Sequence, residues 1–383
     1  MTSELTTHDS RPPTRALIDL DAIARNFHFL RERVGRGRAL YAVLKADAYG
    51  HGAAAVAARL AREGADRFAV ANTEEGIALR RAGIRGEVLL LSHAEPSDLP
   101  RQRSYGLTPA LYDRAQAEAV VAAARGLPEP LRVHLELDTG MGRAGFRAEE
   151  LDAVASLLRN SPQIELAGTF ANLSAADDPA SPETDRQVAA AAACVQRLRA
   201  AGVSPGLVHV ANSAAILAHP QSWFDGVRPG LALYGIAPSE ALASPDLTPA
   251  MTVETRVVGV RHVPAGTPLG YGGRFVTARE TMIAILPIGY HDGFRRSLSG
   301  KVAVLLRGKR APVVGAISMD VTLVDATETG AARGDRAVCI GRDSADAVTV
   351  AELARAAGTI PYEILCGIGP RVTRVYVGGE SSC

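Results

Sequence analysis

The chain has 383 residues, of which 47% are hydrophobic and 22% are charged, and its formal net charge is +1 at pH 7. This length allows two domains, each with a sizeable core, and the composition is ordinary for a soluble globular protein. A net charge near zero gives no electrostatic footprint for nucleic acid or for an anionic membrane. We therefore expect a globular protein that binds neither nucleic acid nor membranes.

The opening stretch MTSELTTHDSRPPTR is polar and lacks the apolar segment of a secretion signal, and no apolar run in the chain reaches membrane-spanning length. We expect residues 1–14 to form a flexible tail. The four cysteines, Cys194, Cys339, Cys366 and Cys383, have no paired spacing of metal ligands. They favour reduced thiols, a cytoplasmic location and no metal site.

Short apolar runs rich in Val, Ile and Leu alternate with alanine-rich segments of helical period, such as Gly52 to Ala65 and Arg186 to Gly202. This alternation predicts repeated strand and helix units, and therefore a (β/α)8 barrel over residues 15–243. The eight predicted strands are 39–44, 67–71, 87–92, 105–110, 131–138, 164–170, 207–212 and 226–235.

Past about Ala243 the pattern changes. Strand-like runs are separated by Gly, Pro and Asp turns, with few helical patterns. The runs are TVETRVVGVRHV, TMIAILPI, KVAVLLRG, APVVGAISMDVTLVDA and DRAVCIG. They predict a second, mostly β domain over residues 244–383, with the boundary near SEALASPDLTP.

The first predicted strand leads into AVLKADAYGHG, where Lys45 follows an apolar run directly. Lysine is seldom buried without a partner, so a functional role competes here with a solvated charge at a strand end. In such barrels the chemistry lies at the carboxyl ends of the strands, and the loops after strands seven and eight commonly hold a phosphate.

Those two loops carry suitable groups. After strand seven, Asn212 and Ser213 can cap a helix whose free N–H groups attract an anion, although a cap alone is the ordinary role for such residues. After strand eight, Gly230 permits close approach of the backbone and Arg228 adds a positive charge. A lysine facing a phosphate site points to pyridoxal phosphate, which needs an amine for its aldehyde and an anchor for its phosphate.

At this point the chain resembles the alanine racemase family, whose members combine a barrel with a β domain. The resemblance runs in order from about Ala16 to Val377 through AVLKADAYGHG, LDTGMGRAGF, HVANSAA, VRPGLALYG, LGYGG, PIGYHDGF, ISMD and YEILCGIGPRV. It implies a Schiff base between pyridoxal phosphate and Lys45. It also implies a cofactor site whose other members are Tyr49, Arg143, His209, Asn212, Ser213, Arg228, Gly230 and Leu231.

Within that site the resemblance assigns the phosphate to Tyr49, Ser213, Gly230 and Leu231. Arg228 faces the pyridine nitrogen, with His209 behind it. A protonated guanidinium donates a hydrogen bond there without giving up its proton, which favours racemisation over transamination. Related decarboxylases place a carboxylate at this position.

The family also places a β-domain tyrosine in the partner subunit's barrel, and Tyr271 in LGYGG matches it. The implied enzyme is a homodimer in which Lys45 serves the D face of the amino acid and Tyr271 the L face. Both groups have high ordinary pKa values, so positive charge or desolvation must lower them, and we nominate Arg143 and Arg228 as the cations.

Substrate binding is implied for Arg143, for Met319 and Asp320 in ISMD, and for Tyr290 in PIGYHDGF. Plain packing is the alternative for the last three. The expected reaction is the interconversion of L- and D-alanine, supplying D-alanine for peptidoglycan. His51 and His291 are interpreted as loop histidines without a ligand role.

Three positions depart from the usual family pattern. Glu136 replaces a carbamylated lysine beside the active-site arginine, Asn172 replaces a histidine near the catalytic tyrosine, and Pro370 replaces a phosphate-binding tyrosine. These departures leave open a racemase of broader specificity, for example for serine. A non-catalytic pyridoxal-phosphate carrier is the further alternative, but such carriers lack the second domain.

Overall fold

The structure is a computed structural model that describes residues 13–93 and 95–379. The described chain divides into two compact units. The barrel unit comprises residues 20–250 with 378–379, and the β unit comprises residues 13–19 with 251–377. This division differs from the expected ranges 15–243 and 244–383, because residues 15–19 form a strand within the sheet of the β unit.

Eight parallel strands close a barrel in the barrel unit, with β9 hydrogen-bonded to β2. Each of the eight predicted runs contributes one strand, so the predicted (β/α)8 barrel is confirmed. The strands are β2 (Ala39–Val43), β3 (Arg67–Val70), β4 (Glu87–His93), β5 (Leu107–Leu111), β6 (Leu131–Leu137), β7 (Ile164–Ala171), β8 (Leu207–Ala211) and β9 (Gly226–Val227).

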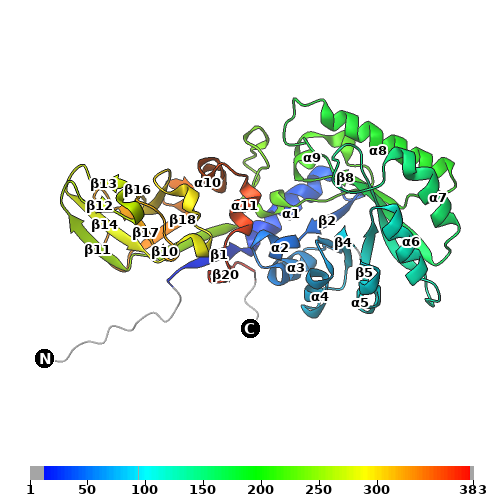
Figure 1. Ribbon diagram of the computed structural model, residues 1–383, viewed down its shortest axis with the longest axis horizontal. Coiled ribbons are helices and arrows are strands. Elements are labelled where there is room, and N and C mark those ends of the chain that lie inside the picture. Colours follow the sequence, from blue (N-terminus) through cyan, green and yellow to red (C-terminus); the bar gives the residue numbers. More distant parts are fainter. Residues whose placement is uncertain (1–12, 94, 380–383) are drawn as a thin grey trace. The chain divides into compact units, whose positions relative to one another are not determined.

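Helices surround these strands (Figure 1). The two helices predicted from alanine-rich patterns are confirmed as α3 and α8. Side-chain caps begin three of the others. Asn72 accepts from the N–H of Glu75, Asp113 from that of Gln116 and Asn212 from that of Ala215. The right-handed helices are α1 (Leu20–Val34), α3 (Ala53–Arg62), α4 (Thr73–Arg81), α5 (Leu99–Ser104), α6 (Arg114–Ala123), α7 (Leu151–Arg159), α8 (Glu183–Ala200) and α9 (Ser213–Ala218).

The eighth barrel strand is much shorter than predicted. Only Gly226 and Val227 form β9, whereas the prediction extended to residue 235. Pro229 has no N–H to donate to a neighbouring strand, and the chain turns there into a 3-10 segment, Leu231–Tyr234. The apolar run LALY is therefore buried as a turn rather than as a strand.

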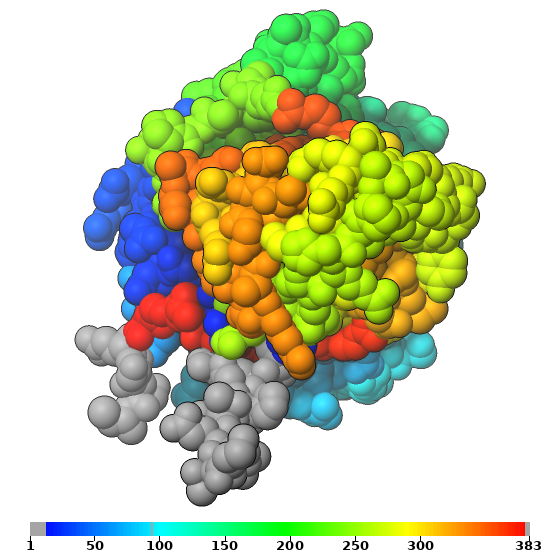
Figure 2. Space-filling view, turned by 90° about the vertical axis from the view of Figure 1, so that its left-hand side faces the viewer, coloured from blue at the N-terminus to red at the C-terminus, as the bar shows by residue number. Residues whose placement is uncertain are grey.

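The β unit is built on one large sheet of order β11-β14-β17-β16-β15-β18-β10-β1-β20, with β19 paired to β18. Figure 2 shows one face of this unit, on which yellow-green, yellow and orange residues lie side by side. Within the sheet, β14 pairs with β17 in antiparallel orientation. The strands are β1 (Arg15–Asp19), β10 (Met251–Arg256), β11 (Gly259–Val263), β14 (Thr281–Leu286), β15 (Ala303–Leu306), β16 (Lys309–Val314), β17 (Thr322–Asp325), β18 (Arg336–Asp343), β19 (Asp346–Val348) and β20 (Thr373–Val377).

Smaller elements complete the β unit. A short hairpin, β12 (Pro268–Leu269) with β13 (Phe275–Val276), packs through Leu269 and Phe275 against Ile283 and Val314 of the sheet. Two helices, α10 (Val350–Ala357) and α11 (Pro361–Cys366), were not predicted from the sequence. The second domain is nevertheless mostly β, as expected.

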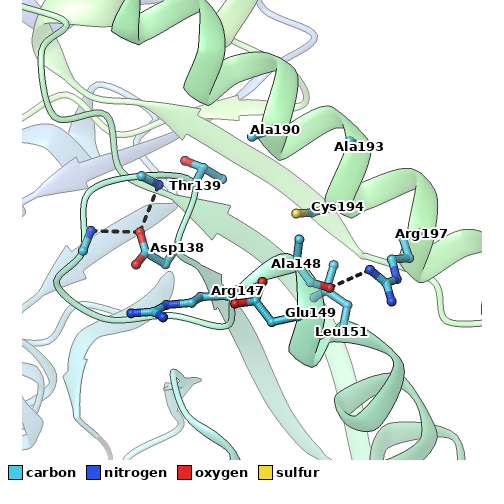
Figure 3. Close-up of a pocket in the computed structure, with 12 residues that line it drawn as sticks. Asp138, Thr139, Arg147, Ala148, Glu149, Leu151, Ala190, Ala193, Cys194 and Arg197 are labelled. Atoms are coloured by element: carbon cyan, nitrogen blue, oxygen red, sulfur yellow. Dashed lines mark hydrogen bonds between the residues drawn. The ribbon is translucent and has the colours of Figure 1, made fainter.

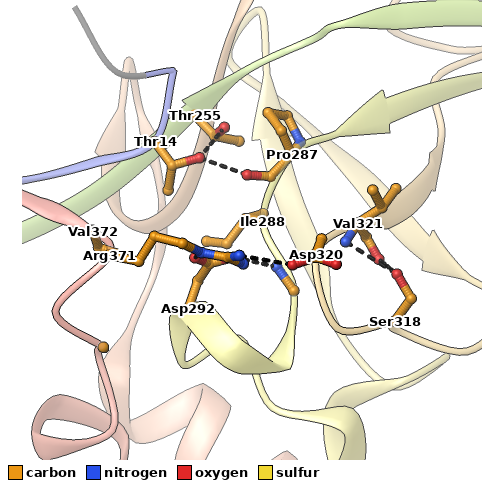
Figure 4. A network of polar contacts seen from close by, with 12 residues as sticks. Thr14, Thr255, Pro287, Ile288, Asp292, Ser318, Asp320, Val321, Arg371 and Val372 are labelled. Carbon is orange, nitrogen blue, oxygen red and sulfur yellow. Dashed lines mark hydrogen bonds and ion pairs between the residues drawn. The ribbon is translucent and has the colours of Figure 1, made fainter.

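The expected flexible tail, residues 1–14, lies outside the described residues except at its end. Thr14 is buried, and its hydroxyl lies 2.7 Å from Thr255 Oγ1 and donates to the carbonyl of Pro287 at 2.7 Å (Figure 4). These contacts anchor Thr14, the last residue of the expected tail, beside the start of β1.

Cys194 and Cys339 are buried thiols, Cys366 is exposed, and Cys383 lies outside the described residues. No helix in the described ranges is long and apolar enough to cross a membrane. Across the same ranges, no three His, Cys, Asp or Glu side chains are grouped to hold a metal ion.

Candidate active site

Lys45 stands just past the end of β2 and begins an unusual turn, α2 (Lys45–Tyr49). Four successive residues have left-handed backbone angles, with φ of 52° at Ala46, 53° at Asp47, 55° at Ala48 and 52° at Tyr49. For residues with a Cβ this conformation costs roughly 1–2 kcal/mol each, so the surroundings must hold it.

Two carboxylates hold the beginning of this turn. Glu75 Oε1 accepts from the N–H of Ala46 at 2.8 Å, while its other oxygen accepts from the N–H of Ala71 at 2.7 Å. Asp47 Oδ1 accepts from the N–H of Ala53 at 2.7 Å. The turn after β2 is thus fastened to the loop after β3 and to the start of α3.

A buried histidine supports the end of the turn. His51 Nδ1 lies 3.0 Å from the carbonyl of Ala48 and 3.1 Å from that of Tyr49, and its ring stacks on Tyr234 at 4.4 Å. Tyr234 in turn donates to the carbonyl of Val43 in β2 at 2.7 Å. His51 therefore supports the backbone that presents Lys45, a role that its loop position in the sequence did not reveal.

The loops after β8 and β9 meet at the same end of the barrel. The Ser213 hydroxyl oxygen accepts from the N–H of Gly230 at 2.8 Å and from that of Ala232 at 3.2 Å. A Cβ at residue 230 would lie 2.5 Å from the Tyr49 hydroxyl oxygen, so glycine is required for this approach. Three of the four predicted phosphate ligands are therefore neighbours, and the fourth, Leu231, follows Gly230 directly.

Asn212 has the ordinary role of a helix cap. Its side-chain oxygen accepts from the N–H of Ala215 at 3.1 Å, and its amide donates to the carbonyl of Leu173 at 3.4 Å. It thereby orients the start of α9, where Ser213 lies.

Arg228 is 5% exposed and is held on several sides. Its Nη1 lies 2.9 Å from His209 Nδ1 and also donates to the His209 carbonyl. Its Nη2 donates to the carbonyls of Ala171 at 2.6 Å and Val210 at 3.3 Å. The four hydrogens on the two Nη atoms thus have protein acceptors, and the remaining donor, Nε–H, is the one that can serve a ligand.

Burial lowers the pKa of Arg228 to about 10, with the negative charge of Glu136 opposing the shift and Arg143 adding to it. Arg228 therefore remains a cation at neutral pH. Glu136 is a 6% exposed residue of β6, whereas Arg143 is an exposed residue of the following loop. The structure thus places the charges of Glu136 and Arg143 in the electrostatic environment of Arg228.

The loop that carries Arg143 is shaped by one carboxylate. Asp138 Oδ1 accepts from the N–H groups of Gly140 and Gly142 at 3.0 Å each (Figure 3). Although burial opposes the shift, these backbone contacts hold the pKa of Asp138 below its ordinary value. The cavity drawn in Figure 3 lies between this loop and helices α7 and α8, and Lys45 and Arg228 do not line it.

Asn172, the second departure from the family pattern, follows β7. Its amide nitrogen lies 3.1 Å from the sulfur of Met141, two residues before Arg143. A thioether is a weak acceptor, so this contact is weak.

In the β unit, Tyr271 is 69% exposed. It begins a tight turn between β12 and β13 in which Gly270, Gly272 and Gly273 all have positive φ. A Cβ at residue 270 would lie 2.9 Å from the Ala316 nitrogen. Glycine is therefore needed both for the turn and for its packing, and the turn presents the tyrosine ring outward.

Tyr290, Met319 and Asp320 lie on two adjoining segments. The N–H of Tyr290 donates to the carbonyl of Ser318 at 2.9 Å, and that of His291 to the carbonyl of Met319 at 3.1 Å. Tyr290 is 41% and Met319 51% exposed. The two predicted substrate segments are therefore held together while both side chains remain accessible.

Arg371 bridges these two segments. It donates to Asp292 Oδ1 from Nε at 2.7 Å and to Asp292 Oδ2 from Nη2 at 3.0 Å, while Nη1 donates to Asp320 Oδ1 at 2.7 Å (Figure 4). Contacts with the two carboxylates raise the pKa of the guanidinium. Arg371 follows Pro370, the third departure, and the sequence analysis did not single it out.

Sequence reasoning thus missed Glu75, His51 and Arg371. A signal existed only for Glu75, because Asn72 and Glu75 have the spacing of a capping box. That pattern predicts a helix start, and it does not predict that the glutamate reaches across to the turn beside Lys45.

Comparisons with known proteins agree with this arrangement. The family profile "Alanine racemase, N-terminal domain" matches residues 18–238, and "Alanine racemase, C-terminal domain" matches residues 250–376. A relative from Symbiobacterium thermophilum named alanine racemase is 42% identical over 98% of this chain and 99% of its own. One from Carboxydothermus hydrogenoformans with the same name is 40% identical over 95% of this chain and 100% of its own.

Solved structures agree as well. The alanine racemase of Streptomyces lavendulae superposes with a TM-score of 0.91 at 37% identity, covering 97% of this chain and 98% of that one. The alanine racemase of Bacillus anthracis, solved with bound L-Ala-P, has a TM-score of 0.91 at 32% identity and covers 96% of each chain. The chain therefore belongs to the alanine racemase family of isomerases.

Proposed function

We propose that the chain is a pyridoxal-phosphate-dependent racemase that interconverts L- and D-alanine as a homodimer. The observation that carries this proposal is Lys45 at the mouth of the barrel, on a turn whose tyrosine touches the loop of Ser213 and Gly230. The expected biological role is supply of D-alanine for peptidoglycan in the cytoplasm.

The residues present fit the cofactor. The sequence contains three lysines, Lys45, Lys301 and Lys309, so Lys45 is the only one between residues 20 and 250. Tyr49, Ser213 and the backbone of Gly230 and Leu231 would hold the phosphate, and Lys45 would hold the aldehyde carbon. When bound, pyridoxal phosphate supplies that aldehyde for amines and a ring that withdraws electrons from the α-carbon.

Arg228 would face the pyridine nitrogen through its Nε–H. It carries its proton at neutral pH despite burial, so it donates a hydrogen bond without protonating that nitrogen. Arg228 would thereby keep the electron demand of the ring moderate. A proton returned to the substrate is directed mostly to the α-carbon, which favours racemisation over transamination.

Two bases would move the proton. For conversion of L- to D-alanine, the Tyr271 phenolate oxygen of the partner subunit accepts the α-proton from one face. Lys45 Nζ then donates a proton to the opposite face, and the reverse conversion exchanges these roles. Arg143 and Arg228 would add positive charge at the barrel mouth, where the proton is transferred.

The substrate carboxylate would be bound by Arg143 together with the Met319 backbone of the partner subunit. The Asp320 segment carries that backbone, and Tyr290 narrows the access to the site. The Bacillus anthracis relative holds L-Ala-P, which supports a site sized for an alanine-like ligand.

The high exposure of Tyr271 supports the shared site. Tyr271 begins a glycine turn and has 69% of its surface accessible, so its ring is available to a second surface. We infer that the barrel of a second copy is that surface, and therefore that the homodimer is the active form.

Purified protein incubated with pyridoxal phosphate and a panel of L-amino acids that includes serine tests the proposal. Chiral chromatography should detect D-alanine as the principal product. Equal or faster formation of D-serine would show the broader specificity that Glu136, Asn172 and Pro370 leave open. Absence of every D-isomer would contradict racemase activity in this chain.

A further inference from the structure

A series of polar side chains in contact with one another crosses the interior of the barrel, starting at Arg228. His209 Nδ1 lies 2.9 Å from Arg228 Nη1, and His209 Nε2 lies 2.9 Å from His134 Nδ1. His134 Nε2 in turn lies 3.2 Å from Glu87 Oε1. The series ends at Glu87, which is the first residue of β4 and thus at the opposite end of the barrel from the site loops.

The interior is built to accept these side chains. Barrel interiors are ordinarily filled by branched aliphatic residues, but here alternate strands β4, β6 and β8 supply Glu87, His134 and His209. A Cβ at residue 168 would lie 2.5 Å from the His134 ring, so Gly168 provides its space. Phe170 stacks on His209 at 5.3 Å. Both histidines are completely buried.

Donor and acceptor chemistry permits one order of protons along the series. Arg228 can only donate, so His209 Nδ1 must accept. A neutral His209 then carries its proton on Nε2 and donates it to His134 Nδ1. His134 must carry its own proton on Nε2, the ring nitrogen that lies 3.2 Å from Glu87 Oε1.

The charges are consistent with this order. Burial lowers the pKa of both histidines, and Arg228 lowers that of His209 further, so both rings are neutral. Although burial opposes the shift, His134 holds the pKa of Glu87 below its ordinary value. Glu87 also accepts from the Tyr41 hydroxyl at 3.1 Å, and its second oxygen lies 3.6 Å from Arg67 Nε.

We propose that Glu87 is a positioning residue for Arg228 and acts through His134 and His209. Its carboxylate keeps the His209 Nδ1 lone pair directed at Arg228 Nη1, which fixes one edge of the guanidinium. The carbonyls of Ala171 and Val210 fix the other edge. Nε–H is thereby aimed at the ligand. The consequence for reaction choice rests on the proposed function, in which Arg228 faces the pyridine nitrogen.

Glu87→Gln tests the proposal because the amide keeps the shape and removes the charge. The holoenzyme is given L-alanine, and the 2-oxo acid released by transamination is measured per D-alanine formed. We expect this ratio to rise roughly threefold to tenfold, the scale of coupling through a contact network. Glu87→Asp, which keeps the carboxylate, should restore a ratio near that of the wild type.

The matched control is Glu165→Gln, since Glu165 stands near the start of β7 and makes an exposed pair with Arg132 at 3.3 Å. This variant should leave the ratio unchanged. If folded Glu87→Gln gives the same ratio as Glu165→Gln, the positioning role of Glu87 is wrong.

A second measurement needs no variant, cofactor or substrate. Nitrogen-15 NMR of histidine-labelled wild-type protein should find His134 and His209 neutral at neutral pH, each with its proton on Nε2. A proton on Nδ1 of either ring would overturn the proposal. If both histidines carry their protons on Nε2 but the protein has no racemase activity, the proposed function is contradicted. The series of contacts from Glu87 to Arg228 is then still supported.

Discussion

The two parts of the candidate site are built in opposite ways. At the mouth of the barrel, Arg228 is 5% exposed and all of its Nη hydrogens have acceptors in the same unit. In the β unit, Tyr271 is 69% and Met319 51% exposed. At the barrel mouth, Arg228 and Ser213 are buried and hydrogen-bonded within their own unit. In the β unit, the side chains of Tyr271 and Met319 are exposed to solvent.

This contrast indicates which functions each part can perform alone. A buried and fully bonded arginine is oriented before any ligand arrives, so the barrel unit suits a permanently held cofactor. The exposed Tyr271 side chain can contact a ligand only where a second surface supplies the rest of the site. Loss of Lys45 in the barrel unit should therefore change cofactor binding, whereas variants in the β unit should change proton transfer or substrate binding while the cofactor stays bound.

The largest effect is expected from Lys45→Ala. This variant removes both the amine that would hold the cofactor and one of the two bases, so activity should fall by at least about a thousandfold. The visible absorbance of the covalently held cofactor should be lost with it. Lys309→Ala, which changes an exposed lysine of β16, is the control and should keep both properties. Wild-type absorbance in Lys45→Ala would show that the lysine is misassigned.

The next effect is expected from Tyr271→Phe. Loss of one acid–base group should reduce racemisation by roughly a hundredfold to ten-thousandfold. Exchange of the α-proton of L-alanine should fall much more than that of D-alanine, and the cofactor absorbance should persist. The control is Tyr376→Phe on β20, which removes a hydroxyl from another partly exposed tyrosine of the β unit. Equal losses for the two isomers would argue against a base that serves one face.

The same contrast explains what the sequence could predict. Every barrel strand was found because buried strands appear as hydrophobic runs. Lys45, Asn212, Ser213, Arg228 and Gly230 were selected from their place after those runs. Tyr49, Arg143, His209 and Leu231 came from the family resemblance. The eighth strand was overextended because LALY is equally apolar as a buried turn. The helices α10 and α11 are short, and local composition dominated by strands concealed them.

Contacts across the chain were beyond sequence reasoning. The left-handed turn after Lys45 contains two alanines, a residue type that gives no sign of positive φ. Glu75 and Arg371 look like ordinary surface charges, and only the fold brings Glu75 to Ala46 and Arg371 to Asp320. His134 and Glu87 were read only as parts of strands, since nothing local shows that they meet inside the barrel.

Glu136→Gln tests whether the barrel mouth depends on a built-in carboxylate. Glu136 supplies negative charge near Arg228, and the family resemblance assigns it to Arg143 in place of a carbamate. Loss of the charge should weaken binding of the substrate carboxylate by about 1–3 kcal/mol, measured as a rise in KM. Wild-type activity should be indifferent to added bicarbonate. Unchanged kinetics in Glu136→Gln, or activation of the wild type by bicarbonate, would contradict the substitution of carboxylate for carbamate.

The smallest effect is expected from Arg371→Gln in the β unit. Arg371 binds Asp292 with two hydrogen bonds and Asp320 with a third, and glutamine is too short and has too few donors to keep all of them. The segment of Met319 should loosen relative to that of Tyr290. We expect kcat/KM for alanine to fall by roughly threefold to tenfold, below the roughly hundredfold cost of a 1 Å misplacement.

Whether the fall in kcat/KM comes from KM, from kcat or from loss of cofactor shows whether Arg371 positions the substrate segments or affects cofactor binding. Because Arg371 belongs to the β unit, KM should rise more than kcat falls, and the cofactor absorbance should match that of the wild type. Arg307→Gln breaks a comparable exposed pair with Asp335 in the same unit and should leave kinetics unchanged. If Arg371→Gln instead releases the cofactor, or has the kinetics of Arg307→Gln, then the bridge does not set the geometry of the substrate segments. The proposed division, in which the barrel unit binds the cofactor and the β unit positions the substrate segments, would then be wrong at Arg371.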